Sequence, residues 1–211
     1  MTSASDFDLA GLSVSRETFS ALQSYESLLR RWTPAINLVS KATLPEFWQR
    51  HIVDSAQLFA LRPPESQTWA DLGSGGGLPG LVIAILAKEF APDMTVTLVE
   101  SDLRKATFLR EVIRTLSLRA EVRAERIEST APLATQVLSA RALAPLSALL
   151  AFADRHLRHD GVALFPKGAR HADELDEARK AWRFDVTTEP SKSDSDAAIL
   201  IIRNIHRASQ H

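Results

Sequence analysis

The fold of this chain is decided by one stretch of sequence, Asp71-Leu72-Gly73-Ser74-Gly75-Gly76-Gly77-Leu78-Pro79-Gly80. The stretch holds five of the chain's eight glycines. Residues 68–70 before it predict the end of a strand, and the apolar run 81–87 after it predicts a buried helix. Glycine adopts positive φ and lets a ligand approach the backbone closely, while a helix N-terminus presents unpaired N–H groups. The strand, turn and helix together therefore predict a site for a polar or anionic ligand.

The spacing of the glycines is compatible with two cofactors. Gly75 to Gly80 matches the dinucleotide pattern G-x-G-x-x-G, which is weak evidence alone. The run from Asp71 through Gly73 to Gly77 matches D-x-G-x-G-x-G, a pattern of S-adenosylmethionine methyltransferases. A leading carboxylate suits a cationic cofactor with an amino-acid end, whereas a pyrophosphate has no use for it. We therefore favour S-adenosylmethionine over the dinucleotide, and over a glycine turn that binds nothing.

A second acidic residue indicates a nucleoside cofactor. Glu100 ends the next predicted strand, twenty residues after Gly80. A carboxylate at the carboxyl end of such a strand can accept hydrogen bonds from both ribose hydroxyls. Because both candidate cofactors contain that ribose, Glu100 predicts the ribose site without choosing between them.

Composition and charge narrow the class of protein. The chain has 211 residues, 45% hydrophobic and 24% charged, which fits one globular domain with a short appendage. It has no cysteine, which excludes disulfides and thiolate catalysis. Its formal net charge of −1 means that nucleic-acid binding requires a local basic patch. No apolar stretch is long enough for a membrane span and the first residues do not resemble a signal peptide, so we expect a cytoplasmic protein without membrane contact.

Residues 1–66 predict an N-terminal helical extension that packs on the main domain, with a loose tail over residues 1–12. Ser15 can cap a helix that runs to about Trp32, with an apolar stripe along one side. Pro34 is expected to break that helix, because proline has no N–H group for the helical hydrogen-bond ladder.

A second helix is predicted to follow the capping-box pattern Thr43-Leu44-Pro45-Glu46 and to reach about Leu61. Arg50 and Asp54 lie four residues apart on it, so they share a face. Their spacing alone favours a surface ion pair over a polar face turned into a pocket.

Residues 67–211 alternate between strand-like and helix-like segments. Strands are predicted at 68–72, 94–100, 121–124, 136–140 and 161–165, and helices at 79–90, 102–116, 145–156 and 170–181. This alternation predicts an α/β fold with a doubly wound, mostly parallel sheet. Segments 184–188 and 198–203 predict a terminal hairpin that adds an antiparallel strand at or near one edge.

Five segments resemble one known family, the bacterial 16S ribosomal RNA guanine-N7 methyltransferases, also called glucose-inhibited division protein B. They are Asn37-Leu38-Val39-Ser40, Arg50-His51-Ile52-Val53-Asp54-Ser55, Asp71 to Gly80, Ser139-Ala140-Arg141-Ala142 and Lys167-Gly168. The glycine loop alone indicates a methyltransferase, and the arginine-histidine-x-x-aspartate-serine run before it points to this family. The resemblance implies a Rossmann-like class I methyltransferase fold, S-adenosylmethionine as methyl donor, and a guanine of the 530 loop as substrate.

The resemblance also carries over cofactor positions. These are Gly73 and Leu78 in the glycine loop, Ile127 and Glu128 beside the adenine, and Arg141 at the end of the fourth strand. Ala124 and Glu125 offer a rival register for the adenine-flanking pair. The complete predicted cofactor site adds the motif residues Asp71, Gly75, Gly77 and Glu100.

Methyl transfer to guanine N7 needs no general base, because N7 presents a lone pair in the neutral base. Positive charge develops on the purine during transfer, and a nearby carboxylate would stabilise it. Asp54, held by Arg50, is the catalytic candidate for this role. Arg141 can bind the cofactor carboxylate or an RNA phosphate, or can form a plain ion pair at the strand end.

The basic segment 155–171 predicts RNA contact through Lys167 and Arg170, at the edge where such folds bind ligands. His156 and His159 lack a third ligand motif, so no metal is expected. The implied partner is 16S rRNA, within the small ribosomal subunit or an assembly intermediate, and we expect a monomer. Three other functions compete: methylation of a small molecule or protein, nicotinamide-dependent oxidoreduction, and non-catalytic RNA binding during assembly.

Overall fold

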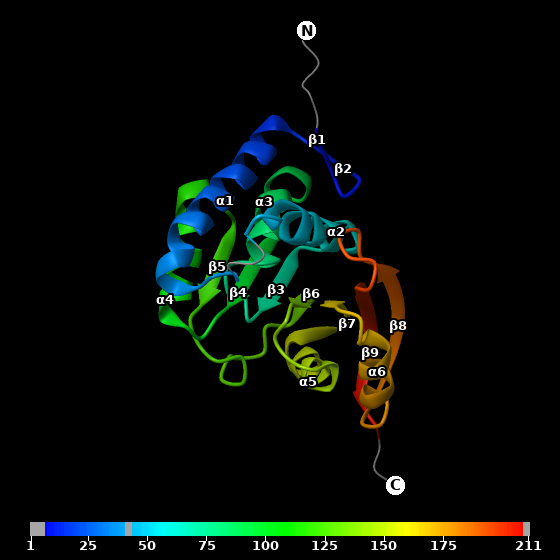
Figure 1. Ribbon diagram of the computed structural model, residues 1–211. Helices are drawn as coiled ribbons and strands as arrows, with labels where there is room; N and C mark the ends of the chain where they lie inside the picture. Colours follow the sequence, from blue (N-terminus) through cyan, green and yellow to red (C-terminus); the bar gives the residue numbers. More distant parts are fainter. Residues whose placement is uncertain (1–6, 41–43, 209–211) are drawn as a thin grey trace.

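The computed structural model describes residues 7–40 and 44–208, which build a sheet covered by helices on both faces (Figure 1). The seven strands lie in the order β5-β4-β3-β6-β7-β9-β8. They are β3 (Thr68–Leu72), β4 (Thr95–Val99), β5 (Ala120–Arg123), β6 (Thr135–Ala140), β7 (Leu157–Lys167), β8 (Trp182–Pro190) and β9 (Ala198–Arg207). β3 pairs in parallel with both β4 and β6. Strands β4 and β5 are added on one side of β3, and β6 and β7 are added on the other side. The predicted doubly wound parallel sheet is confirmed.

The terminal hairpin is also confirmed. β9 lies antiparallel to β7 on one side and to β8 on the other, and β8 forms the edge of the sheet. The apolar run at the start of β9 is buried, as expected for a strand with neighbours on both sides. β7 extends further than the predicted strand at both ends, because its last residues continue to pair with β9.

The helices divide into two groups. They are α1 (Arg16–Ile36), the π-helix η1 (Trp48–Val53), α2 (Asp54–Ala60), α3 (Gly80–Phe90), α4 (Leu103–Leu116), α5 (Leu146–His156) and α6 (His171–Ala178). In Figure 1, α1 to α4 lie on one side of the sheet, and α5 and α6 lie on the other. Each side has its own buried apolar cluster. α3 is apolar nearly all round, because it lies between the sheet and the N-terminal helices.

The first helix differs from its prediction at the C-terminal end. Ser15 caps it as predicted, since the Ser15 hydroxyl accepts from the Thr18 amide. Pro34 does not break the helix, which continues to Ile36. Proline here removes only one hydrogen bond in the last turn, and the helix closes when the Asn37 amide donates to the Thr33 carbonyl at 2.9 Å. Asn37 itself has φ of 48°, a left-handed conformation that asparagine tolerates.

The expected loose tail is wrong for residues 7–12, while residues 1–6 lie outside the described part of the chain. β1 (Phe7–Leu9) and β2 (Leu12–Val14) form a small antiparallel hairpin. Leu9 and Val14 are buried, and the Phe7 ring stacks on Phe19 of α1 with centroids 4.1 Å apart. These apolar contacts with α1 fix the segment.

The second helix begins later than its capping-box pattern suggests. Thr43 lies outside the described residues, and the described helical segment starts with η1 at Trp48. Arg50 lies within this π-helix, and Asp54 begins α2 directly after it.

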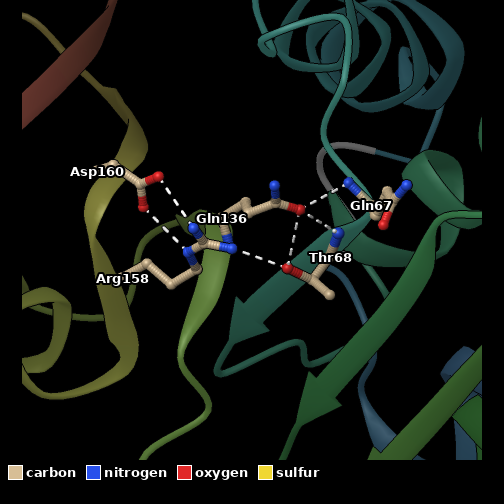
Figure 2. A network of polar contacts seen from close by, with 5 residues as sticks. All are labelled: Gln67, Thr68, Gln136, Arg158 and Asp160. Carbon is tan, nitrogen blue, oxygen red and sulfur yellow. Dashed lines mark hydrogen bonds and ion pairs between the residues drawn. The ribbon is translucent and has the colours of Figure 1, made fainter.

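A polar network fixes the amino-terminal edge of the sheet (Figure 2). The Gln136 side-chain oxygen accepts from the Gln67 and Thr68 amides at 2.8 and 3.2 Å. The Thr68 hydroxyl in turn accepts from the backbone amide of Gln136 at 3.0 Å. Arg158 and Asp160 form an ion pair beside it. The network aligns β3 with β6. This register brings the residues at the carboxyl ends of the two strands close together.

One buried hydrogen bond joins the N-terminal helix to the glycine loop. The Tyr25 hydroxyl of α1 donates to the Gly76 carbonyl at 2.7 Å, and the Tyr25 side chain is fully buried. Burial raises the pKa of Tyr25, so the phenol stays protonated and remains a donor. The first helix therefore supports the loop directly as well as through apolar packing.

Tyr25→Phe should lower the free energy of unfolding by about 1–3 kcal/mol, because it leaves the buried Gly76 carbonyl without a donor. Urea unfolding measures the change. Ser27→Ala is the matched control, since Ser27 makes only an exposed hydrogen bond on the same helix. Equal effects of the two substitutions would contradict a special role for the Tyr25 contact.

Candidate functional site

The glycine loop follows β3 and forms the floor of the candidate site. Gly73 and Gly75 have φ of 67° and 54°, which an L-residue with a side chain adopts only at a cost. A Cβ at Gly73 would lie 2.7 Å from the Leu143 side chain, whereas a Cβ at Gly75 would meet only the Gly73 carbonyl oxygen, at 3.8 Å. The loop thus presents bare backbone to a cavity, as the motif predicts.

Glu100 lies beside the loop and binds its backbone. One Glu100 oxygen accepts from the Gly75 amide and the other from the Asp102 amide, both at 2.8 Å. We call the adjoining space of about 420 Å³ the Glu100 cavity; it is lined by Gly73, Gly75, Glu100, Glu125, Ile127 and Glu128, among others. The predicted ribose residue and the predicted adenine-flanking pair therefore share one cavity. Of the rival pair, only Glu125 lines it.

A second space lies on the other side of the loop. This glycine-loop cavity, of about 440 Å³, is lined by Leu38, His51, Gly73, Gly76, Leu78 and Arg141, among others. Leu78 is largely buried and forms part of its wall. Gly77 has φ of 90° and supports the turn without lining either cavity.

Asp71 opens the glycine motif and lies near the end of β3. Its side chain is fully buried and lines neither cavity. One carboxylate oxygen accepts from the Ser139 hydroxyl at 2.8 Å and the other from the Gly80 amide at 3.2 Å. Ser139 also accepts from the indole of Trp69 at 2.9 Å. Asp71 thus ties β3 to β6 and to the start of α3, and its assignment to the cofactor site stays a prediction.

Burial raises the pKa of Asp71 to about 6, against the opposing effects of the Ser139 hydroxyl and the Gly80 amide. The folded protein therefore holds a proton on Asp71 more tightly than the unfolded chain does. This carboxyl links the stability of the loop to pH.

Arg141 follows β6 and reaches back toward the N-terminal helices. Its Nη1 donates to Nδ1 of His51 at 2.7 Å. Burial lowers the pKa of Arg141 from its ordinary value, and Tyr25, Asp54 and Asp71 raise it. Arg141 lines both the glycine-loop cavity and a larger third one, so it stands between them.

The third space, here the Asp54 cavity, measures about 630 Å³. It lies between α2, the segment after β6 and the terminal hairpin, and its lining includes Asp54, Arg141, Leu143, Lys167, Arg170 and Ser191. Leu143 lines both this cavity and the Glu100 cavity. All three cavities therefore meet at the segment 141–144, next to the glycine loop.

Asp54 faces this cavity, but Arg50 does not hold it. The Asp54 oxygen Oδ1 accepts from the hydroxyls of Ser191, at 3.2 Å, and Ser193, both in the hairpin loop. Arg50 instead pairs with Glu46 at 2.9 Å. The expected Arg50–Asp54 pair is wrong, because each side chain has another partner: Glu46 for Arg50, and the two hairpin-loop serines for Asp54. Arg50 lies at a separate surface hollow, so its assignment as a catalytic residue finds no geometric support.

The charge state of Asp54 reflects two opposing influences. Partial burial raises its pKa, and the two serine hydroxyls together with Arg141 lower it. Hydroxyl donors stabilise the ionised form, because hydrogen bonds to a charged oxygen are the stronger ones. A carboxylate held by the hairpin loop therefore faces the largest cavity of the site.

The predicted basic patch is divided by the fold. Lys167 is only 9% exposed, and its ammonium donates to Glu174 at 2.7 Å and to the Ala144 carbonyl at 3.0 Å. Arg170 is 84% exposed at the rim of the Asp54 cavity. Arg158 lies at the amino end of β7 and pairs with Asp160. Lys167 thus holds the segment after β6, and Arg170 is the exposed cation of the predicted pair.

Comparisons with known proteins show the family to which the chain belongs. Residues 18–199 match the model of the GidB family, described as rRNA small subunit methyltransferase G. The chain belongs to this family. A relative from Ruegeria sp. (strain TM1040), named ribosomal RNA small subunit methyltransferase G, is 49% identical over 93% of this chain and 95% of its own. One of the same name from Rhodospirillum centenum is 52% identical over 96% and 91%.

Solved structures place the fold among class I S-adenosylmethionine-dependent methyltransferases. A TehB-like S-adenosylmethionine-dependent methyltransferase from Corynebacterium glutamicum superposes with a TM-score of 0.58 over 86% of this chain and 98% of its own, at 15% identity. A protein described as an O-methyltransferase from Klebsiella pneumoniae gives 0.58 over 87% and 90%, at 17% identity. At such low identity these structures show the fold alone. No helix in residues 7–40 and 44–208 is long and apolar enough to cross a membrane.

Sequence reasoning missed four residues of the site: Tyr25, His51, Ser191 and Ser193. His51 stands inside the arginine-histidine-x-x-aspartate-serine run, so the motif itself was the available signal. The two serines belong to a polar loop more than a hundred residues from Asp54, and nothing in their local pattern connects them to it.

Asp71→Asn should change how stability depends on pH. The raised pKa of Asp71 means that wild-type stability falls as pH rises from about 4, near the unfolded pKa, to about 6, and then levels off. The asparagine variant cannot titrate, so the wild-type unfolding free energy should fall relative to it by about 3 kcal/mol across this window. Urea unfolding at a series of pH values tests this. Ser139→Ala should extend the fall to higher pH, and parallel curves for wild type and Asp71→Asn would contradict the argument.

Proposed function

We propose that this chain transfers the methyl group of S-adenosylmethionine to guanine N7 in 16S rRNA. The observation that carries the proposal is the meeting of three cavities at segment 141–144, beside a glycine loop of the methyltransferase type. Family membership supports rRNA of the small subunit as the substrate. The choice of guanine N7 rests on the sequence resemblance.

The residues around the loop fit S-adenosylmethionine. Glu100 would accept from the ribose hydroxyls, and Ile127 with Glu128 would flank the adenine, since all three line the Glu100 cavity. Gly73 and Leu78 would lie along the amino-acid end in the glycine-loop cavity. Gly75 fits because it lines both cavities with positive φ, which leaves the backbone bare toward the cofactor. When bound, this cofactor supplies an electrophilic methyl group.

The Asp54 cavity is the proposed site of the target guanine. Its volume of about 630 Å³ accommodates a purine base, and it adjoins both cofactor cavities at segment 141–144. Guanine N7 needs no deprotonation, so the protein's task is to hold the base in line and to stabilise the charge that develops on it. Asp54 would provide the negative charge that stabilises the cationic base, and Ser191 and Ser193 would keep its carboxylate in place.

RNA contact would use the exposed rim of this cavity. Arg170 is the member of the predicted pair that is free to reach a phosphate, since its nearest acidic neighbour, Asp173, is 3.7 Å away and itself exposed. Lys167 would act indirectly, by holding the Ala144 carbonyl and Glu174. We propose that the acceptor RNA is presented within the small ribosomal subunit or an assembly intermediate.

Two competing functions predict different results. The oxidoreductase is disfavoured because Tyr25, the only tyrosine, is buried and bound to the Gly76 carbonyl. A methyltransferase of other substrates would label small molecules or proteins instead of rRNA. Transfer of a radiolabelled methyl group to small subunits, to naked 16S rRNA and to total protein, followed by mapping of the labelled base, tests the proposal. Absence of label in rRNA would refute it.

Glu100→Ala should weaken S-adenosylmethionine binding by about 1–3 kcal/mol in calorimetry, because the ribose hydroxyls lose their acceptor. The same change releases the Gly75 and Asp102 amides, so the melting temperature must be measured beside it. Glu125→Ala is the matched control, as it removes another carboxylate from the same cavity. Unchanged affinity in Glu100→Ala would refute the ribose placement, and a larger loss in Glu125→Ala would favour the rival register.

Asp54→Asn should slow single-turnover methylation roughly ten- to a hundredfold at saturating substrates, because the amide keeps the shape but not the charge. Cofactor affinity should stay close to that of wild type, since the charge matters most when the purine is cationic. Asp196→Asn is the matched control, as Asp196 is exposed in the loop that holds Asp54 and is not among the charges that shift the pKa of Asp54. A wild-type rate with a lowered melting temperature would reduce Asp54 to a structural residue.

A further inference from the structure

Arg141 carries a positive charge that no carboxylate in the described part of the chain contacts. Among the residues the structure describes, its one hydrogen-bond partner is the His51 ring, through Nη1 at 2.7 Å. No ion pair within 4.0 Å joins Arg141 to a described acidic residue. Guanidinium is always charged and only donates hydrogen bonds, so His51 Nδ1 must be the acceptor.

The acidic residues near Arg141 are engaged elsewhere. Asp54 binds the hydroxyls of the hairpin loop, and Asp71 binds Ser139 and the Gly80 amide. Both still act on Arg141 through space, since they raise its pKa. A half-buried guanidinium normally has a carboxylate partner, because an uncompensated charge is costly to desolvate. The guanidinium of Arg141 can therefore bind an anion that is not part of the chain.

His51 binds Arg141 through Nδ1, while its other ring nitrogen has no hydrogen-bond partner among the described residues. Because Nδ1 accepts from Arg141, the ring proton of neutral imidazole is on Nε2, which is buried without a partner in the described residues. Burial, and next Arg141, lower the pKa of His51 to about 4, so the ring stays neutral and its acceptor persists. The Phe47 ring packs edge-on against the imidazole, with centroids 5.3 Å apart, and fixes its plane.

We propose that His51 is a positioning residue, which holds Arg141 as an uncompensated cation to bind the carboxylate of the cofactor's amino-acid end. The inference rests on the proposed function, because it requires S-adenosylmethionine in the glycine-loop cavity. An uncharged acceptor suits the task, since a carboxylate at position 51 would fix the guanidinium equally well but would cancel its charge.

The position of Arg141 favours a cofactor carboxylate over an RNA phosphate. Arg141 and His51 line the same cavity as Gly73, Gly76 and Leu78 of the loop. Arg141 also acts electrostatically on Tyr25, whose hydroxyl is bonded to the loop itself. A small carboxylate reaches this depth beside the loop more readily than a phosphate of a folded RNA, for which Arg170 at the exposed rim is better placed.

The test compares two ligands by calorimetry on the full chain. S-adenosylhomocysteine carries the amino-acid end, and methylthioadenosine lacks it. His51→Ala should weaken S-adenosylhomocysteine binding roughly ten- to a hundredfold and methylthioadenosine binding by less than about twofold. His51→Asn should recover most of the affinity, because its amide oxygen supplies an uncharged acceptor near the Nδ1 position. His51→Asp should weaken S-adenosylhomocysteine binding although it also supplies an acceptor.

Other outcomes overturn the inference separately from the function. His159→Ala, an exposed histidine at the far end of β7, is the control and should bind both ligands as wild type does. Equal losses for both ligands in His51→Ala, or no loss for either, would refute the positioning role while wild-type binding upheld the cofactor. Loss of RNA binding alone, with S-adenosylhomocysteine unaffected, would assign Arg141 to a phosphate. Failure of wild type to bind either ligand would refute the proposed function itself.

Discussion

The buried carboxylate of Asp71 is the contact on which the site depends. It joins three elements at one point: β3, which carries it, β6 through the Ser139 hydroxyl, and α3 through the Gly80 amide. The parallel register sets Asp71 directly opposite Ser139, so the hydrogen bond follows from strand pairing. Because the glycine loop spans from Asp71 to Gly80, both of its ends are fixed by one side chain. The acidic residue of the motif therefore fixes the conformation of the glycine loop through its contacts with Ser139 and Gly80.

The N-terminal helices and the terminal hairpin form the remaining walls. Tyr25 binds the loop backbone, and Gln57 of α2 exchanges hydrogen bonds with the hairpin at the Pro190 carbonyl and the Lys192 amide. The hairpin returns two hydroxyls to Asp54. Segments from both ends of the chain therefore complete a site that the central sheet only begins.

Charges in the site are separated by their partners. Lys167 is neutralised by Glu174, and its ammonium serves the backbone of the segment after β6. Arg141 keeps its charge, because its contact is a neutral ring. Asp54 accepts from two hydroxyls, which lower its pKa against the larger, raising effect of burial. A cation and an acidic group thus lie beside adjoining cavities, which suits a reaction in which positive charge moves from donor to acceptor.

The sequence by itself determined the features that depend on near neighbours. The strand–helix alternation, the glycine turn and the Ser15 cap of α1 follow from patterns over a few residues, and the structure reproduces them. Only the tertiary structure decided which charges meet. Arg50 pairs with Glu46 instead of Asp54, the hairpin loop supplies Asp54 with serines from 137 and 139 residues away, and Asp71 is buried. Such contacts depend on strand register and on long-range packing, which local spacing does not encode.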